Sequence, residues 1–330
     1  MAQATGVGSM PGTDFAESLK IVLDKLPDLP HLPELPDRGV ESAMIGRTLG
    51  LIAHLGFDLQ PAGWRLTDAG GVDQRRARSR LDQDLDLLEE LTQGHLGQLK
   101  IQVTGPWTLA ATVERPRGDK ILGDPGARRE LSQALAEAVS EHLVDVRRRV
   151  PGAELVVQVD EPALPAVLAG SIASASGLHR HRTIGQAEAS QSLGWVYQAI
   201  TDTSATALTH CCAGDFPIAM IRAAGSLVSL DPRVLTAQRF EELAECLDAK
   251  QKVFLGIAPT SITRPWQVRE LLESLTRLLE MLGFATGEVS DYLVLTPACG
   301  LSASGLSSSG AAELSSSLGA IHSAAQEVGA

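Results

Sequence analysis

Short apolar runs alternate along the whole chain with longer segments that have apolar residues at helical spacing, and this pattern limits the possible folds. Most of the apolar runs end in a polar residue or a proline, which is typical of buried parallel strands followed by helices. We predict strands at eight places: near 6–8, 63–66, 99–103, 155–159, 205–208, 226–230, 252–257 and 292–295. Eight strand–helix units are typical of a (β/α)8 TIM barrel.

An open parallel sheet is the alternative to a barrel. Such sheets more often have five or six strands and a glycine-rich phosphate-binding turn. The sequence contains neither a G-x-G-x-x-G nor a Walker pattern, and it has no internal repeat and no linker that would divide it. We therefore expect residues 1–330 to form a single (β/α)8 barrel domain.

Composition excludes several classes of partner. Hydrophobic residues make up 44% of the 330 residues and charged ones 21%, which is enough to build a sizeable core. The formal net charge of −12 argues against a nucleic-acid partner, because counterion release needs clustered Lys and Arg. No stretch approaches the roughly 18 unbroken apolar residues of a membrane span, and the N-terminus does not resemble a signal peptide. The composition favours a cytoplasmic protein with a small-molecule ligand and no membrane partner.

The cysteines are few, and their placement suggests a metal site. The chain has four: Cys211, Cys212, Cys246 and Cys299. His210 and Cys212 are two residues apart at a predicted strand end, so both side chains point the same way while Cys211 points oppositely. With Cys299 and Asp231 from later strand ends they make a donor set suited to zinc. The alternative is a pair of buried core thiols, which is also the interpretation we favour for Cys211 and Cys246.

Other polar residues follow predicted strands and would meet at the same rim of a barrel, where active sites form. Ser9 ends the first strand, and Asp160 and Glu161 end the strand over 155–159. Adjacent carboxylates cannot both face the barrel mouth, so we expect Asp160 to bind ligand and Glu161 to cap or pair locally. The arginine-rich run 75–80 is typical of a solvated helix face, although it could also attract an anionic part of a substrate.

Five of these strand ends together resemble a known family. The segments TGVGSMP, TGPWTLA, VQVDEPAL, HCCAGDFP and TPACGL occur in the order found in the catalytic barrel of cobalamin-independent methionine synthase, and the resemblance extends from Gly6 to about Val328. It implies a zinc-dependent methyltransferase that moves a methyl group to the thiolate of homocysteine and so makes methionine.

The resemblance also implies roles for individual residues. It implies zinc ligation by His210, Cys212 and Cys299, with Asp231 where the family has a glutamate after a longer connection. Ser9 would hold the homocysteine carboxylate, and Asp160 its amino group. Two further residues have implied roles. Glu34 would be a second acid in the substrate site, and Trp64 would be the tryptophan against which a folate ring packs.

Two departures from the family pattern concern the methyl donor. Full-length family enzymes carry an additional N-terminal barrel that helps to bind folate, whereas this sequence offers only the catalytic barrel. The family's histidine proton donor follows the seventh strand, where this chain has Ala258 and Pro259. The methyl donor could therefore be a methyl-folate or a methyl-corrinoid protein, and the residue acting as catalytic acid is unknown. Two other functions stay open: a related zinc barrel that methylates another small thiol, and a non-catalytic zinc-binding barrel.

Overall fold

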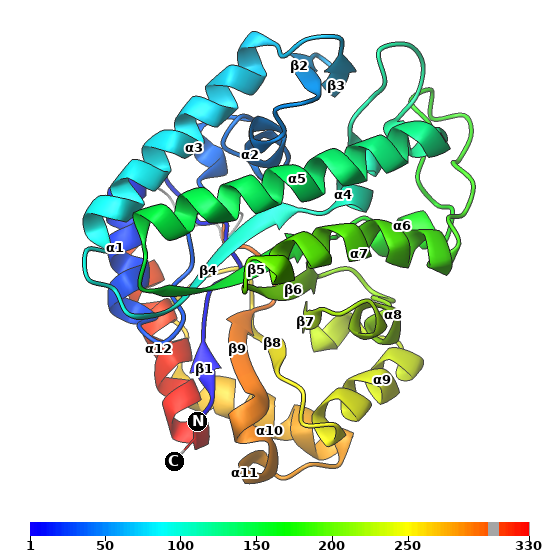
Figure 1. The fold of residues 1–330 in the computed structure, drawn as a ribbon. Helices are drawn as coiled ribbons and strands as arrows, with labels where there is room; N and C mark the ends of the chain where they lie inside the picture. The colour runs from blue at the N-terminus through cyan, green and yellow to red at the C-terminus, as the bar shows by residue number, and fades with distance from the viewer. Residues whose placement is uncertain (303–309, 330) are drawn as a thin grey trace.

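The computed structural model describes residues 1–302 and 310–329, and in this part of the chain a parallel sheet curls into a barrel surrounded by helices (Figure 1). Its strands follow the order β1-β9-β8-β7-β6-β5-β4. Their bounds are β1 Gln3–Ala4, β4 Gly97–Thr104, β5 Ala153–Asp160, β6 Thr206–Cys211, β7 Leu227–Leu230, β8 Val253–Ala258 and β9 Leu293–Pro297. Neighbouring strands pair in parallel throughout this sheet, which confirms the predicted barrel-type α/β fold.

The eighth position in the barrel wall differs from the prediction. The strand expected at 63–66 is β3 (Gly63–Thr67), but it pairs antiparallel with β2 (Gly56–Gln60) in a separate hairpin. The proline-rich segment 30–34 instead lies between β1 and β4: Lys100 N donates to Pro30 O, Leu32 N donates to Lys100 O, and Glu34 N donates to Gly8 O. Prolines lack the N–H that a regular ladder needs, so this segment closes the barrel through isolated bridges rather than a strand.

Helices cover the outside of the barrel (Figure 1). The α-helices are α1 Phe15–Lys25, α2 Met44–Leu51, α3 Val72–Leu91, α4 Pro106–Thr112, α5 Pro125–Arg149, α6 Leu164–Leu168, α7 Gln186–Asp202, α8 Ile218–Ala223, α9 Ala237–Asp248, α10 Val268–Leu282, α11 Thr286–Val289 and α12 Ala311–Gly329. Short 3₁₀ helices are η1 Pro36–Arg38, η2 Ile121–Gly123, η3 Pro232–Val234 and η4 Ser290–Tyr292. Among the described residues, no helix combines the length and the apolar character needed to span a bilayer.

The strands separate two apolar layers because their side chains alternate in direction. Leu99, Ile101 and Val103 of β4 belong to the main core between the sheet and the helices. A second, small cluster fills the barrel interior and consists of Leu29, Val156, Leu208, Phe254 and Val294. Further along the same strands toward their carboxyl ends, the inward positions become polar. The interior is thus closed by apolar packing at one level and lined by polar groups above it.

Candidate metal and amino-acid site

A cluster of one imidazole and two thiols lies at the carboxyl ends of the strands. His210 and Cys212 come from the end of β6 and Cys299 follows β9, and their potential ligand atoms all lie within 4.8 Å of one another. The Sγ atoms of Cys212 and Cys299 are 2.7 Å apart, and both cysteines are free. Cys211 lies between the two ligand candidates in sequence and is fully buried in the main core, as its alternate position predicts.

The ring of His210 is held in one orientation. Its Nδ1 lies 3.0 Å from the Oγ of Ser229, which is the register partner of His210 on β7. Its Nε2 is buried and has no hydrogen-bond partner. A buried ring nitrogen without a partner is costly unless something coordinates it, and the two sulfurs are the groups next to it. Ser229 was not anticipated from the sequence, because only the pairing of β6 with β7 brings it to the histidine.

The two thiols divide their protons unequally. The hydrogen bond from Cys212 is the main cause that lowers the pKa of Cys299, to about 4, while burial opposes this shift and His210 adds to it. The same hydrogen bond, together with burial, raises the pKa of Cys212. The two thiols are therefore electrostatically linked, and a bound divalent cation would favour the thiolate form of both.

The donor set fits zinc. Two thiolate sulfurs and a neutral imidazole nitrogen are ligands that Zn²⁺ prefers, and three protein ligands with one open position are typical of catalytic zinc sites. The unpartnered Nε2 of His210 is the observation that carries this fit.

Asp231 is not part of this cluster, which differs from the expectation. Its Oδ1 accepts hydrogen bonds from the backbone N and the Nε of Arg233, at 3.0 and 2.8 Å, and its Oδ2 accepts from Arg233 Nη2 at 2.9 Å. The physical reason is local: Asp231 is the N-cap of η3, and a guanidinium two residues later occupies both carboxylate oxygens. In this structure the metal site has three candidate ligands, and ligation by Asp231 is not supported.

Two carboxylates lie beside the thiol and imidazole cluster. Asp160 is the register partner of His210 on the neighbouring strand β5 and is 6% exposed. Burial raises the pKa of Asp160 well above its usual value, and the nearby charge of Glu34 adds to this. Glu34 is also buried, and burial raises its pKa, although Arg47, at 3.5 Å from Nε to Oε1, opposes the shift. A cationic ligand between these two acids would favour their ionised forms.

Ser9 lies where the first and last strands meet the cluster. It forms a parallel bridge with Glu34, and its backbone O accepts a hydrogen bond of 2.7 Å from Leu301 N. A Cβ on Gly300 would overlap the Ser9 Oγ, so glycine after Cys299 allows the serine to approach. The structure thus brings Ser9, Glu34 and Asp160 to the rim that carries the metal candidates.

This close approach gives a first prediction. We expect Gly300→Ala to destabilise the protein by about 1–3 kcal/mol, since the added methyl group forces Ser9 to move. Urea unfolding measures the change. Gly194→Ala in α7 is the matched control, because a Cβ there meets nothing within 4 Å and alanine favours a helix. Equal stability of Gly300→Ala and the wild type would contradict the tight contact with Ser9.

Several buried charged and polar residues near the site were missed from the sequence. Lys100 is fully buried inside the barrel, and burial lowers its pKa to about 7 although Asp160 and Glu34 oppose this. Arg47 contacts Glu34 and also Asp84, whose carboxylate forms two hydrogen bonds with Arg38. The signal was available in β4, where lysine, glutamine and threonine occupy alternate positions of an otherwise apolar strand.

Glu161 has the local role expected of it. Its carboxylate accepts hydrogen bonds from the backbone N of Trp107, from the backbone N of Thr108 and from Thr108 Oγ1, at 2.7–2.8 Å. It thereby satisfies free N–H groups at the start of α4. Burial nevertheless raises the pKa of Glu161 to about 7. Glu161 is therefore a structural partner of α4, and Asp160 is the carboxylate of the pair that lies next to the cluster.

The residues that bear on the methyl donor, Trp64 and Ala258, are buried in this structure. Trp64 lies on β3 and is 5% exposed within the main core, so its ring face is covered in this structure. Ala258 ends β8 and is fully buried, with Pro259 after it. Neither side chain can donate a proton. A role of Trp64 in binding the methyl donor stays a prediction.

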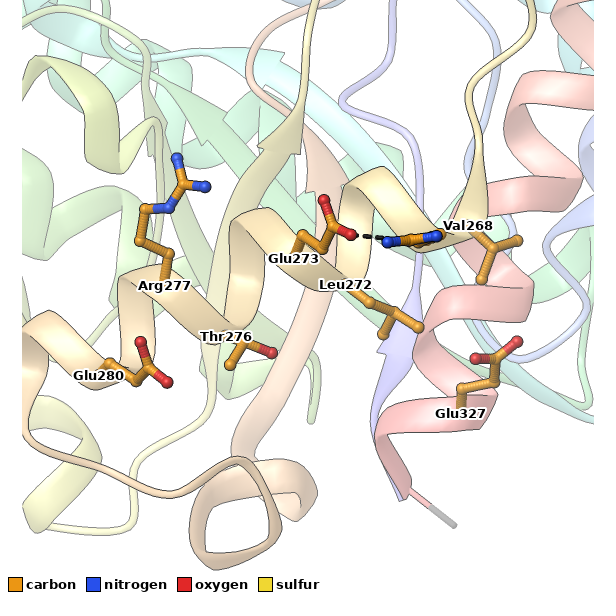
Figure 2. Close-up of a pocket in the computed structure, with 8 residues that line it drawn as sticks. Val268, Leu272, Glu273, Thr276, Arg277, Glu280 and Glu327 are labelled. Carbon is orange, nitrogen blue, oxygen red and sulfur yellow. Dashed lines mark hydrogen bonds and ion pairs between the residues drawn. The ribbon is translucent and has the colours of Figure 1, made fainter.

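A pocket of about 650 Å³ lies on the outer helices, away from the cysteine cluster (Figure 2). It lies between α10 and α12. On α10, Arg269 Nε forms an ion pair of 2.7 Å with Glu273 Oε1, and Figure 2 marks this contact at Glu273 by a dashed line. The lining residues of the pocket are Val268, Arg269, Leu272, Glu273, Thr276, Arg277, Glu280 and Glu327. These residues include neither an unpartnered buried polar atom nor a member of the metal cluster, so the chemistry lies at the strand ends.

Comparisons with known proteins concern the family and the fold of this chain. The family model described as the catalytic domain of cobalamin-independent synthase matches residues 87–326, which include Asp160, His210, Cys212 and Cys299. A solved B12-independent methionine synthase from a Shewanella species, in complex with selenomethionine, has the same fold, with a TM-score of 0.63 and 14% identity over 99% of this chain and 98% of that chain. A search of curated proteins finds no match. Since the family model covers well over half of the sequence, the chain belongs to the cobalamin-independent synthase catalytic-domain family.

Proposed function

We propose that this protein is a zinc-dependent methyltransferase that moves a methyl group to the thiolate of homocysteine and so forms methionine. Family membership supports methyl transfer in general. The observation that carries the finer proposal is the unpartnered Nε2 of His210 facing two cysteine sulfurs, beside a buried pair of carboxylates. The selenomethionine bound to the Shewanella enzyme is an analogue of the proposed product, which supports the same substrate class here.

Each residue of the site has a task in this proposal. His210, Cys212 and Cys299 would hold the zinc, and Ser229 would keep the imidazole in the tautomer that leaves Nε2 free. When bound, zinc would supply Lewis-acid activation that keeps a substrate thiol deprotonated at neutral pH, where a free thiol with a pKa of about 8.5 is mostly protonated.

The carboxylates and Ser9 would orient the amino-acid end of the substrate. Asp160 and Glu34 offer negative charge to its ammonium group, and Ser9 offers a hydroxyl to its carboxylate. Fixing the amino acid in this way directs its thiol toward the cysteine cluster, which favours in-line transfer of the methyl group. We also propose that residues 1–330 act as a single barrel domain, and that the four free cysteines operate in a reducing compartment such as the cytoplasm.

The identity of the methyl donor is the second part of the proposal. Transfer from a methyl-folate leaves an amine nitrogen that needs a proton. Transfer from a methyl-corrinoid protein leaves the electron pair of the broken cobalt–carbon bond on cobalt, and this leaving group needs no proton. The chain has Ala258 and Pro259 after β8, and neither supplies a proton. This favours a corrinoid or otherwise activated donor over free methyl-folate.

We expect single-turnover methylation of homocysteine to be about 10²- to 10⁴-fold faster from methylcobalamin than from methyl-tetrahydrofolate, because a positioned general acid contributes about that much. Rapid quench with zinc-loaded protein measures both rates. Comparable rates from the two donors would show that another group supplies the proton. Absence of methylation from either donor, with zinc bound, would favour the non-catalytic barrel, and methylation of another thiol only would favour the related thiol methyltransferase.

A further inference from the structure

The barrel interior holds a charged group to which the proposed reaction assigns no task. Lys100 on β4 is fully buried, and its Nζ donates two hydrogen bonds of 2.8 Å, to the backbone O of Val7 and to Oε1 of Gln158. Both acceptors are neutral. A buried ammonium group held by neutral acceptors is expensive to retain, so a task for it beyond packing is expected.

Gln158 connects this lysine to the candidate substrate site. Its Nε2 donates at 2.8 Å to Oδ1 of Asp160, two residues along β5, and at 2.8 Å to Val7 O. An ammonium group is only a donor, so Lys100 requires the carbonyl oxygen of the Gln158 amide on its side. The amide group must then present its NH₂ to Asp160. The lysine therefore decides which way the amide faces, and the amide decides how the carboxylate is held.

Two positive and two negative side chains surround this connection. Lys100 and Arg47 are positive, Glu34 and Asp160 are negative, and all four side chains are buried. Lys100 lies close enough to influence both acids, and Arg47 pairs with Glu34. Both acids are therefore influenced by a buried positive side chain before any ligand binds.

We propose that Lys100 is a positioning residue for the amino group of the substrate: through Gln158 it fixes one oxygen of Asp160, so that the carboxylate keeps a single orientation toward the substrate ammonium. This inference rests on the proposed function, because it takes Asp160 as the partner of an amino-acid thiol. It differs from a general role in stability, since the effect of Lys100 passes through Asp160 and concerns the ammonium group alone.

Binding of two thiols to zinc-loaded protein tests the proposal. L-Homocysteine carries the ammonium group, and 4-mercaptobutanoate has the same thiol and carboxylate without it. By calorimetry, Lys100→Met is expected to weaken homocysteine binding about tenfold and to leave 4-mercaptobutanoate binding unchanged, because the loss is that of a hydrogen bond to a charged group. Combining Lys100→Met with Asp160→Asn is expected to weaken homocysteine binding no further than Asp160→Asn alone.

A second variant covers the case in which Lys100→Met does not fold. Gln158→Glu keeps an acceptor for Lys100 but removes the donor to Asp160, so it should produce the same selective loss. Lys252→Met is the matched control, since that half-buried lysine precedes β8 and its Nζ donates to Oε1 of Gln3, at the opposite end of the barrel from the cysteine cluster. It should bind both thiols as the wild type does.

The opposing outcomes are distinct. Equal weakening for both thiols, additive effects in the double variant, or tighter binding of homocysteine by Lys100→Met would overturn the positioning role while leaving the proposed function intact. Failure of the zinc-loaded wild type to bind homocysteine would refute the proposed function itself, and this inference with it.

Discussion

Cys212→Ser and Cys299→Ser are each expected to reduce bound zinc from about one ion per chain to a small fraction of that. Each substitution removes one of three candidate ligands whose donor atoms lie within 4.8 Å of one another. Zinc sites of this kind rest on a few strong bonds, with apparent binding free energies of about 10–16 kcal/mol, so the loss of one thiolate should weaken binding by orders of magnitude. Metal analysis after dialysis against a weak chelator measures the stoichiometry.

The controls follow from the same geometry. Cys246→Ser should keep full zinc, because Cys246 is buried on α9 and its Sγ donates to the backbone O of Glu242. Asp231→Asn should also keep it, because Arg233 occupies that carboxylate. Ser229→Ala should have an intermediate effect and bind zinc about 10- to 100-fold more weakly than the wild type. A loss of this size is usual when a residue that orients a metal ligand is removed. Full zinc in both Cys212→Ser and Cys299→Ser would eliminate the metal site.

Asp160→Asn is expected to weaken binding of homocysteine by at least about 30-fold while zinc content stays at one per chain. Removing one partner of a buried charge pair costs about 2–5 kcal/mol, since the substrate ammonium would be left without its counter-charge. Asp160 is 6% exposed, so water replaces the lost interaction poorly. Calorimetric titration of the zinc-loaded variant with homocysteine gives the dissociation constant.

A thiol without the amino group provides the control for Asp160→Asn. We expect 4-mercaptobutanoate to bind the variant and the wild type with the same affinity, because it has no ammonium group to interact with the Asp160 carboxylate. Unchanged affinity for homocysteine would show that Asp160 does not hold the amino group. Loss of zinc from the variant would instead indicate that Asp160 supports the metal cluster, to which it is adjacent through His210.

The parts of the fold that depend on patterns of a few neighbouring residues could be predicted from the sequence. The strands that became β4 to β9 were predictable because each is a local apolar run that ends in a polar residue or a proline. The spacing of His210 and Cys212 placed both on one face of an extended segment.

Two expectations from the sequence were not met, one because of a distant partner and the other because of a near neighbour in the chain. Segment 30–34 carries no strand pattern, and only closure of the barrel between Gly8 and Lys100 makes it part of the wall. Asp231 has the right charge and position for a ligand, yet the turn into η3 directs it to Arg233. The strand that contains Trp64 pairs in a hairpin outside the parallel sheet, and the role of Trp64 in binding the methyl donor stays a prediction.

Local patterns in the sequence were enough to predict the alternation of strands and helices and the donor types of the candidate metal cluster, because these depend on side-chain type and on spacings of a few residues. The partners of these groups became known from the folded chain, such as Ser229 for His210 and Gln158 for Lys100. The cost of leaving a polar group unpaired in a barrel interior forces such pairings. Which atom satisfies each group is set by strand register, which brings together residues tens of positions apart in the chain.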